Sequence, residues 1–350
     1  MEEQLTARTN AKLFGHDKTE DSLLRDLAAG KLAHGLIFAG ERGIGKATLA
    51  YRLARTLLAD SGAAGESRIA ANSHADLLVI ERLYDEKKEE FATDISVEQA
   101  RQISQFLSLT AGEGAWRVVI IDSADALNNA AANAILKILE EPPPRTVLIL
   151  IAHNVGRLLP TIRSRCRLVS FSPLSTEDFS QAIRHVAAEN TGGIYGEELA
   201  ALGVLSGNSV GIALEMRAAG AVILYNQTLE LMAGAAEGKI DGAQILRYCE
   251  QIGSGKKAHA NWQLFMRIVL CILERIAKTA INAKIEPVSE EEGALLQQIA
   301  SLHSAEIWAE KWQQASSQFS LAQSLHLDYK QIALTFFHSI ICEDEFILGN

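Results

Sequence analysis

The first half of the chain alternates short apolar runs with helical patterns. Five apolar runs cover residues 34–40, 76–81, 116–122, 146–152 and 167–171. Within each run the hydrophobic residues are continuous rather than alternating, which is typical of parallel strands covered on both faces. Because helical patterns separate the runs, the sequence predicts a doubly wound α/β domain in which helices flank a parallel sheet.

The segment between the third and fourth runs illustrates how the sequence marks a helix. Its apolar positions recur at helical spacing, at Ala132, Ile135, Leu136 and Leu139. The prolines at 142–144 end this pattern, because proline lacks an N–H donor and its ring clashes with the preceding turn. We therefore expect a helix that stops before residue 142.

Strand-like runs nearly disappear after about residue 173. Residues 173–222 open with a capping signature, Ser175 or Thr176 followed by acidic residues, and continue with helical patterns. A longer helical block fills residues 223–350, and its aromatic and aliphatic residues at helical spacing are expected to be mostly core. The sequence thus predicts three parts, with the α/β domain at residues 1–172.

A glycine-rich stretch, GERGIGKATLA at residues 40–50, comes close to the phosphate-binding pattern G-x-x-x-x-G-K-[ST]. It follows an apolar run and precedes a helical pattern, where backbone N–H groups and a helix N-terminus are aimed at anionic oxygens. The candidate phosphate-binding residues are Gly40, Gly43, Gly45 and Lys46. The alternative is a glycine-rich turn with a surface lysine, but the strand–loop–helix context favours descent from a nucleotide site.

The same site departs from the pattern where magnesium chemistry is expected. Ala47 stands where a Ser or Thr hydroxyl normally ligates Mg²⁺. Thr48 is one residue too far along the helix to replace that hydroxyl simply, although we keep it among the candidates. Asp122 ends the third run and suits Mg²⁺ held through water, but Ser123 follows where ATPases of this architecture carry a glutamate base. Asp125 is expected to be solvated or to cap a helix.

Composition narrows the function further. The chain has 350 residues and a net charge of 33 − 43 = −10, whereas a protein that grips DNA by itself needs a positive surface. Any role with nucleic acid is therefore local or shared with partners. A disulfide framework or zinc site is not expected, because no C-x-x-C pair occurs among the cysteines, which are Cys166, Cys249, Cys271 and Cys342. No signal peptide or apolar span is seen, so we expect a cytoplasmic protein that does not enter the membrane.

Four stretches carry a resemblance to a known family. They are HGLIFAGERGIGKATLA, SHADLLVIE, the segment from RVVIIDSAD through LEEPPPRT to LLPTIRSRCRLVSF, and HLDYKQIALTFF. Together they resemble the delta-prime subunits of the bacterial DNA polymerase III clamp loader, with near-continuous cover of the first domain. The related tau/gamma subunits share the Ser-Arg-Cys motif but resemble this chain less.

The resemblance implies an architecture and a set of partners. An AAA+ nucleotide-binding domain would occupy residues 1–172, a small helical lid 173–222 and a helical collar 223–350. The collar would join the chain to tau/gamma and delta subunits in a hetero-pentameric ring. The sliding beta clamp and primed DNA would be reached through that assembly.

The motif Ser164-Arg165-Cys166 carries the most specific residue assignment. The resemblance implies that Arg165 is an arginine finger facing the ATP site of a neighbouring subunit. A guanidinium suits this task because it stays charged and presents a planar fork to phosphate oxygens. The alternative is that Arg165 pairs with a carboxylate at a strand edge. Cys166 is expected to be a small packed residue.

Two further positions differ from catalytic relatives. Active relatives have a polar sensor before the Ser-Arg-Cys segment, where this chain has His153 and Asn154, and a sensor arginine in the lid, where it has Gly211. Many relatives also have four clustered cysteines after the phosphate loop, whereas here His74 survives alone, so no zinc is expected. Taken with the changes in the magnesium site, these differences predict a chain that requires no cofactor and does not hydrolyse ATP. Residual ATP or ADP binding stays open.

We therefore expect a non-hydrolysing structural subunit of the clamp loader, which helps load the sliding clamp onto primed DNA. Such a chain belongs to the DNA-directed DNA polymerase holoenzyme but has neither ATPase nor polymerase activity of its own. One alternative is a catalytically active, tau/gamma-like AAA+ ATPase, and the losses around the phosphate loop argue against it. Another is a nucleotide-gated adaptor outside replication, which the paired LEEPP and Ser-Arg-Cys motifs disfavour.

Overall fold

A computed structural model describes residues 6–341 with gaps. The gaps are residues 60–61, 86–89, 110–111, 113–115, 191–192, 237–238, 240–241, 254, 256–257 and 326. The chain divides into two compact units, Met1–Gly193 with Asn208–Gly211, and Ile194–Gly207 with Ile212–Asn350. The predicted boundaries at residues 172 and 222 stay predictions.

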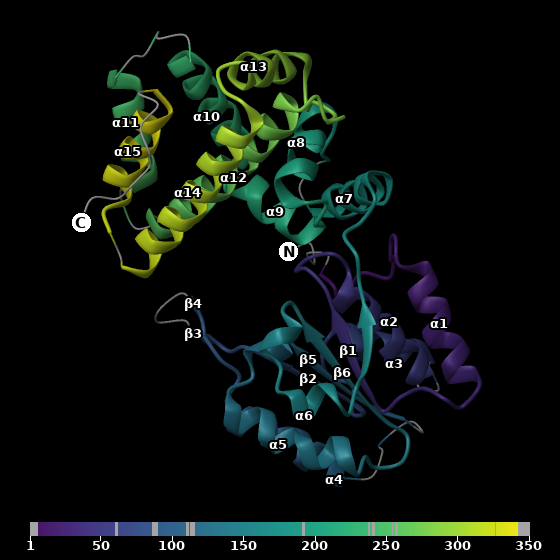
Figure 1. The fold of residues 1–350 in the computed structure, drawn as a ribbon. Helices are drawn as coiled ribbons and strands as arrows, with labels where there is room; N and C mark the ends of the chain where they lie inside the picture. Colours follow the sequence, from purple (N-terminus) through teal and green to yellow (C-terminus); the bar gives the residue numbers. More distant parts are fainter. Residues whose placement is uncertain are drawn as a thin grey trace. The chain divides into compact units, whose positions relative to one another are not determined.

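The first unit is built on a parallel sheet of five strands, in the order β2-β5-β6-β1-β7 (Figure 1). The strands are β1 (Gly35–Ala39), β2 (Leu77–Glu81), β5 (Arg117–Asp122), β6 (Thr146–Ala152) and β7 (Arg167–Ser170). Every neighbouring pair is parallel. The parallel sheet and each of its predicted strands are thus confirmed.

Helices cover both faces of this sheet (Figure 1). One face packs against α1 (Asp17–Ala28), α2 (Lys46–Leu57) and α3 (Gly62–Ala70), and the other against α4 (Val97–Ser108), α5 (Asn129–Glu140) and α6 (Pro160–Arg163). The unit also contains α7 (Thr176–Asn190), the short 3-10 turns η2 (Ala124–Ala126) and η3 (Val155–Arg157), and a ribbon of β3 (Tyr84–Asp85) and β4 (Glu90–Phe91).

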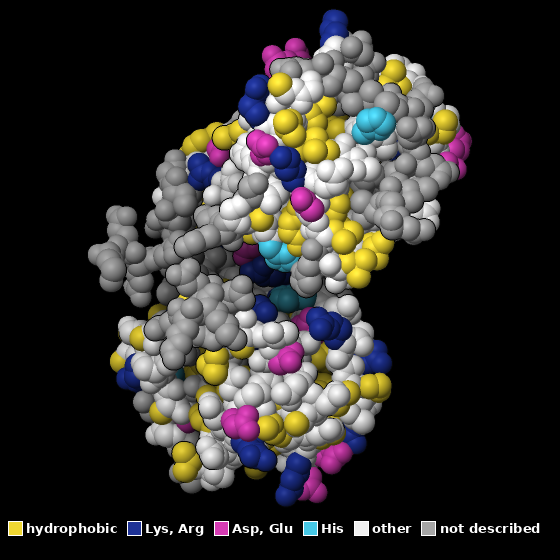
Figure 2. Space-filling view, turned by 90° about the vertical axis from the view of Figure 1, so that its left-hand side faces the viewer, with side chains coloured by type: hydrophobic (Ala, Val, Ile, Leu, Met, Phe, Trp, Pro, Cys, Tyr) yellow, Lys and Arg dark blue, Asp and Glu magenta, His cyan; other side chains and the backbone are white. Residues whose placement is uncertain are grey.

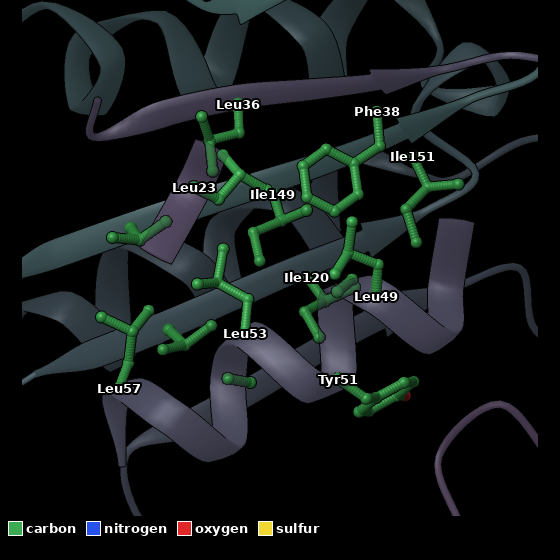
Figure 3. Close-up of a cluster of buried hydrophobic side chains, with 14 of the residues drawn as sticks. Leu23, Leu36, Phe38, Leu49, Tyr51, Leu53, Leu57, Ile120, Ile149 and Ile151 are labelled. Atoms are coloured by element: carbon green, nitrogen blue, oxygen red, sulfur yellow. The ribbon is translucent and has the colours of Figure 1, made fainter. Parts of the chain in front are cut away.

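The side chains of successive strand residues belong to two different apolar clusters, one on each face of the sheet. Phe38 packs with Leu49 and Leu53 of α2 (Figure 3), whereas its neighbour Ile37 belongs to the cluster that includes Ile135 of α5. Because side chains alternate along a strand, a sheet buried on both faces needs apolar residues at every position. This explains why the apolar runs in the sequence are continuous.

Side-chain caps mark the starts of α5 and α7. The Asn128 side chain accepts a hydrogen bond from the Ala131 N–H (2.8 Å) at the start of α5, and α5 ends at Glu140, two residues before Pro142. The Ser175 hydroxyl accepts from the Asp178 N–H (3.0 Å) at the start of α7, which confirms the predicted cap. Capping side chains satisfy N–H groups that the first helical turn leaves without partners.

The described part of the second unit is helical, as the sequence predicts. Its helices are α8 (Gly196–Ser206), α9 (Val210–Ala218), α10 (Ala221–Ala236), α11 (Gly242–Gly253), α12 (Ala258–Ala280), α13 (Glu290–Ala300), α14 (Ala305–Ser324) and α15 (Tyr329–Ile341). Aromatic rings fill its core, and the Trp262 ring stacks on Tyr329 and meets Phe319 edge-on. Trp262 and Phe319 are fully buried and Tyr329 is half-buried, which agrees with the expectation that such residues are mostly core.

A buried ion pair joins three helices of the second unit. Arg275 on α12 donates to Glu292 on α13 from Nε (3.0 Å) and from Nη2 (2.9 Å). Tyr225 on α10 donates its hydroxyl to the same carboxylate, and the Val288 N–H donates at 2.5 Å. The pairing compensates charges that would otherwise be costly to bury.

Taken one at a time, the described helices are too short or too polar to span a membrane. Among neighbouring helices in the described residues, one bent pair, Gly196–Ser206 and Val210–Ala218, is long and apolar enough when its two members are taken together.

Candidate functional site

The loop from Gly40 to Lys46 connects the carboxyl end of β1 to α2. Its backbone is left-handed at Gly43 (φ +77°) and at Gly45 (φ +106°), the residue that precedes α2. Residues with a Cβ rarely adopt this conformation, so glycine is required at both positions. The predicted phosphate-loop glycines are therefore where the curl of the loop needs them.

The Lys46 ammonium lies inside this loop. Its Nζ donates to Gly40 O (2.7 Å), to Glu41 O and to His153 Nδ1 (3.1 Å), and the residue is 3% exposed. Burial lowers the pKa of Lys46 to about 8, while nearby carboxylates, first among them Asp122, oppose the shift. The cation that would meet a phosphate is thus bonded to the chain's own acceptors.

The carboxyl ends of β5 and β6 lie beside the loop. Asp122 ends β5 and is paired in register with Glu81, the last residue of β2. Burial, followed by the charge of Glu81, raises the pKa of Asp122 to about 6. His153 follows β6, and burial together with the Lys46 charge lowers its pKa to about 4, so its ring is neutral at pH 7 and Nδ1 can accept from Lys46. Carboxyl ends of parallel strands are where α/β sheets bind ligands.

Asp125 is half-buried and bonds the backbone of another segment, which neither of the two expected roles anticipated. Its carboxylate accepts from the backbone N–H groups of His153 (3.1 Å) and Asn154 (3.2 Å). The Asn154 side chain in turn accepts from the Gly156 N–H (2.9 Å). Two acidic or polar groups near the phosphate loop are therefore used to shape the turn after β6, because its backbone donors need acceptors.

The residues around the loop fit a phosphate better than a magnesium ion. Glycines and a helix N-terminus form the phosphate-loop geometry. Ala47, by contrast, packs its methyl group against the apolar cluster, and Thr48 is buried in the first turn of α2 at 9% exposure. Among the described residues no group of three or more His, Cys, Asp or Glu is arranged to hold a metal ion, and the expectation of no zinc stays a prediction.

The segment 208–211 packs directly on the phosphate loop. The Gly211 N–H donates to Gly43 O (3.0 Å), and Ser209 Oγ donates to Arg42 O (2.7 Å). A Cβ at Gly211 would lie 2.9 Å from Gly43 Cα, which is too close for contact. The position where the resemblance implies a sensor arginine in active relatives therefore has no room for a side chain in this chain unless the loop moves.

His16 is a loop contact that sequence reasoning missed. It is 6% exposed, and its Nε2 donates to Ile44 O (2.7 Å). Its ring also meets the Phe171 ring edge-on. No motif surrounds His16, so the sequence holds no signal for this contact. Together with Lys46 and the 208–211 segment, it gives the five loop carbonyls from residue 40 to residue 44 a donor from the chain itself.

Arg165 lies at the amino ends of the parallel strands, whereas the phosphate loop lies at their carboxyl ends. A Cβ at Gly35, the first residue of β1, would be 3.4 Å from Arg165 O, whereas the loop begins after Ala39, the last residue of that strand. Four residues of strand separate the two by about 13 Å of backbone. The fold thus brings Lys46 and Asp122 together at the carboxyl ends of the strands and keeps Arg165 apart from both.

The Arg165 side chain pairs with the end of α5. Its Nη2 donates to Glu140 Oε1 (2.6 Å), and its Nη1 donates to Thr161 O (2.9 Å) and to Ser164 Oγ (3.2 Å). A carboxylate partner is what the alternative interpretation of this arginine anticipated. Cys166 packs as predicted, because its Sγ would lie 2.8 Å from a Cβ at Gly35, and burial raises the pKa of its thiol to about 11.

The first unit is similar to known subunits of DNA polymerase III. Residues 15–175 match the family model described as DNA polymerase III, delta subunit. The DNA polymerase III subunit delta' of Pseudomonas aeruginosa is 44% identical over 142 residues, which cover 38% of this chain and 42% of that protein. The Escherichia coli subunit delta' is 34% identical over 161 residues, or 44% and 46% of the two chains.

A third relative matches over a longer stretch at lower identity. The DNA polymerase III subunit gamma of Buchnera aphidicola is 27% identical over 279 residues, which cover 77% of this chain and 72% of that protein. The matches to the delta' proteins thus span less than half the length of those relatives. They confirm the predicted resemblance to the delta-prime family over a region that includes the phosphate loop and Arg165.

Proposed function

We propose that this chain is a clamp-loader subunit of DNA polymerase III that does not hydrolyse ATP and supplies Arg165 to the nucleotide site of a neighbouring subunit. The similarity to delta' proteins supports the clamp-loader assignment. Its partners would be tau/gamma and delta subunits in a five-membered ring. The ring as a whole would engage the sliding beta clamp and primed DNA.

The separation of Arg165 from the phosphate loop is the observation that carries this proposal. An arginine at the amino ends of the strands cannot reach a nucleotide held at the carboxyl ends of the same strands. Any phosphate that Arg165 contacts must therefore belong to another molecule. An arginine supplied from outside contributes about 10³–10⁵ to the rate of phosphoryl transfer, because it stabilises charge that builds in the transition state.

The experiment is ATP turnover by a ring reconstituted with tau/gamma and delta subunits. Arg165→Ala should leave the subunit stoichiometry normal, measured by native mass spectrometry, and should lower clamp-dependent ATP turnover. Arg165→Lys should rescue only part of the loss, because a point charge lacks the planar fork. Arg163→Ala is the matched control, since Arg163 is an exposed arginine on the adjoining helix. Equal turnover by the Arg165→Ala and wild-type rings would remove the finger from the proposal.

The non-hydrolysing role rests on three replaced groups. Ala47 removes a magnesium ligand, Ser123 removes the base and Gly211 removes a phosphate cation. In addition, Lys46 already bonds acceptors of its own chain. Residual ATP or ADP binding through the loop glycines remains compatible with this arrangement, and no cofactor is required for the role.

The match to a gamma subunit over 77% of this chain favours one second candidate, a catalytically active tau/gamma-like ATPase. Steady-state turnover of the isolated chain distinguishes the two. The proposal expects no turnover above a Lys46→Ala control. A wild-type rate of about 1 s⁻¹, near the low end of typical enzymes, would favour the active ATPase instead.

A further inference from the structure

The chain itself engages both terminal nitrogens of Arg165. A guanidinium has five N–H donors. Three of them are directed at Glu140 Oε1 (2.6 Å), Thr161 O (2.9 Å) and Ser164 Oγ (3.2 Å). An arginine in this arrangement must give up at least one of these partners before both terminal nitrogens can bond a phosphate.

Glu140 is the partner that can be exchanged. Thr161 and Ser164 precede Arg165 by four positions and one position, whereas Glu140 comes from the end of α5, 25 positions earlier. The side chains of the pair are 33% exposed at Arg165 and 49% exposed at Glu140. Water and ions therefore reach the pair, and exposed pairs of this kind are weak.

Glu140 is also well placed to fix the direction of the arginine. It is the last residue of α5, and the proline run after it prevents the helix from continuing. Ile135 and Leu139 anchor α5 in the apolar cluster that also holds Ile162 of α6. Glu140 thus ends a packed helix, and Arg165 follows two residues after a second helix that packs in the same cluster.

We propose that Glu140 is the positioning residue of Arg165: its carboxylate is the counter-ion of the guanidinium in the unassembled chain, and a nucleotide phosphate on a neighbouring subunit replaces it. This inference rests on the proposed function of Arg165. Exchange is favourable because a polyphosphate offers more charge and more acceptor oxygens than the single carboxylate oxygen bonded here. Until assembly, the pairing keeps the charge of the arginine neutralised.

The first test uses the isolated chain and the arginine reagent phenylglyoxal, with the modification of Arg165 followed by peptide mass spectrometry. Glu140→Gln should speed the modification of Arg165 by up to about fivefold at low salt, the factor that an exposed ion pair can supply. The difference should shrink in high salt because counter-ions screen the pair. Glu141→Gln is the matched control, since it removes an equal charge from the next, exposed residue. Equal modification in Glu140→Gln and wild type would overturn the inference.

The second test uses the reconstituted ring. Glu140→Gln should lower the apparent KM for ATP by up to about fivefold at low salt with kcat unchanged, because the phosphate no longer competes with a carboxylate. The effect should disappear in an Arg165→Ala background and in high salt, and Glu141→Gln should behave as wild type. An unchanged or higher KM in Glu140→Gln, in a ring whose turnover still depends on Arg165, would overturn the inference and leave the finger intact. If Arg165→Ala itself changed nothing, the finger and the exchange would both be wrong, whatever the labelling result.

Discussion

Removing one member of the buried ion pair in the second unit should destabilise that unit strongly. Arg275 and Glu292 have side chains only 10% and 4% exposed. Glu292→Gln keeps the shape of the side chain but leaves the Arg275 charge buried without a counter-charge. It also weakens an acceptor that serves the Tyr225 hydroxyl and the Val288 N–H.

The expected cost follows from this burial. Breaking a buried pair by changing one partner costs about 3–5 kcal/mol in the free energy of unfolding. For a unit of this size each kcal/mol lowers Tm by about 2–4 °C, so a shift of about 6–20 °C is expected. Replacing both members by apolar residues, as in Arg275→Met with Glu292→Leu, should recover part of the loss because no charge is then left buried.

Urea and thermal unfolding followed by tryptophan fluorescence measure this effect, since Trp262 and Trp308 are buried in the second unit. Glu274→Gln is the matched control on the same helix as Arg275. Glu274 pairs with Lys278 at 2.6 Å, but both side chains are about half exposed, and its loss should cost no more than about 0.5 kcal/mol. Equal effects of Glu292→Gln and Glu274→Gln would refute the reasoning from burial.

Three other expectations follow from the first unit and from the charge of the chain. Gly211→Ala should cost about 1–3 kcal/mol, measured by urea unfolding, because its Cβ would lie 2.9 Å from Gly43 Cα; Gly242→Ala, where the space is open, should cost nothing. His153 has its pKa lowered by burial from 6.5 to about 4, so the folded chain binds fewer protons than the unfolded chain between these values. Stability should therefore fall as pH drops from about 6.5 towards 4, and His153→Gln should flatten that slope in urea unfolding at each pH. The isolated chain should bind primed DNA weakly and with a steep salt dependence in a fluorescence anisotropy titration. The reasons are the net charge of −10 and the interspersed basic and acidic side chains on the face shown in Figure 2. Nanomolar binding at physiological salt would contradict this prediction.

Hydrophobic pattern by itself determined the strands and their environment. A strand buried on both faces must be apolar at every position, so the run at 146–152 could be assigned to a covered parallel sheet without knowledge of its neighbours. The phosphate loop was predictable for a similar reason. Glycine is required where the backbone turns left-handed, and this requirement leaves a local mark at Gly43 and Gly45.

Only the tertiary structure decided which polar groups meet. Ser209 bonds the phosphate loop from 167 positions away, and Glu140 reaches Arg165 across 25 positions. Asp125 was expected to be solvated or to cap a helix, yet it bonds the backbone after β6. Periodicity reports whether a position faces the core or water, because burial depends on one residue at a time. A hydrogen bond depends on two residues, and their distance and orientation are set by how the whole chain packs.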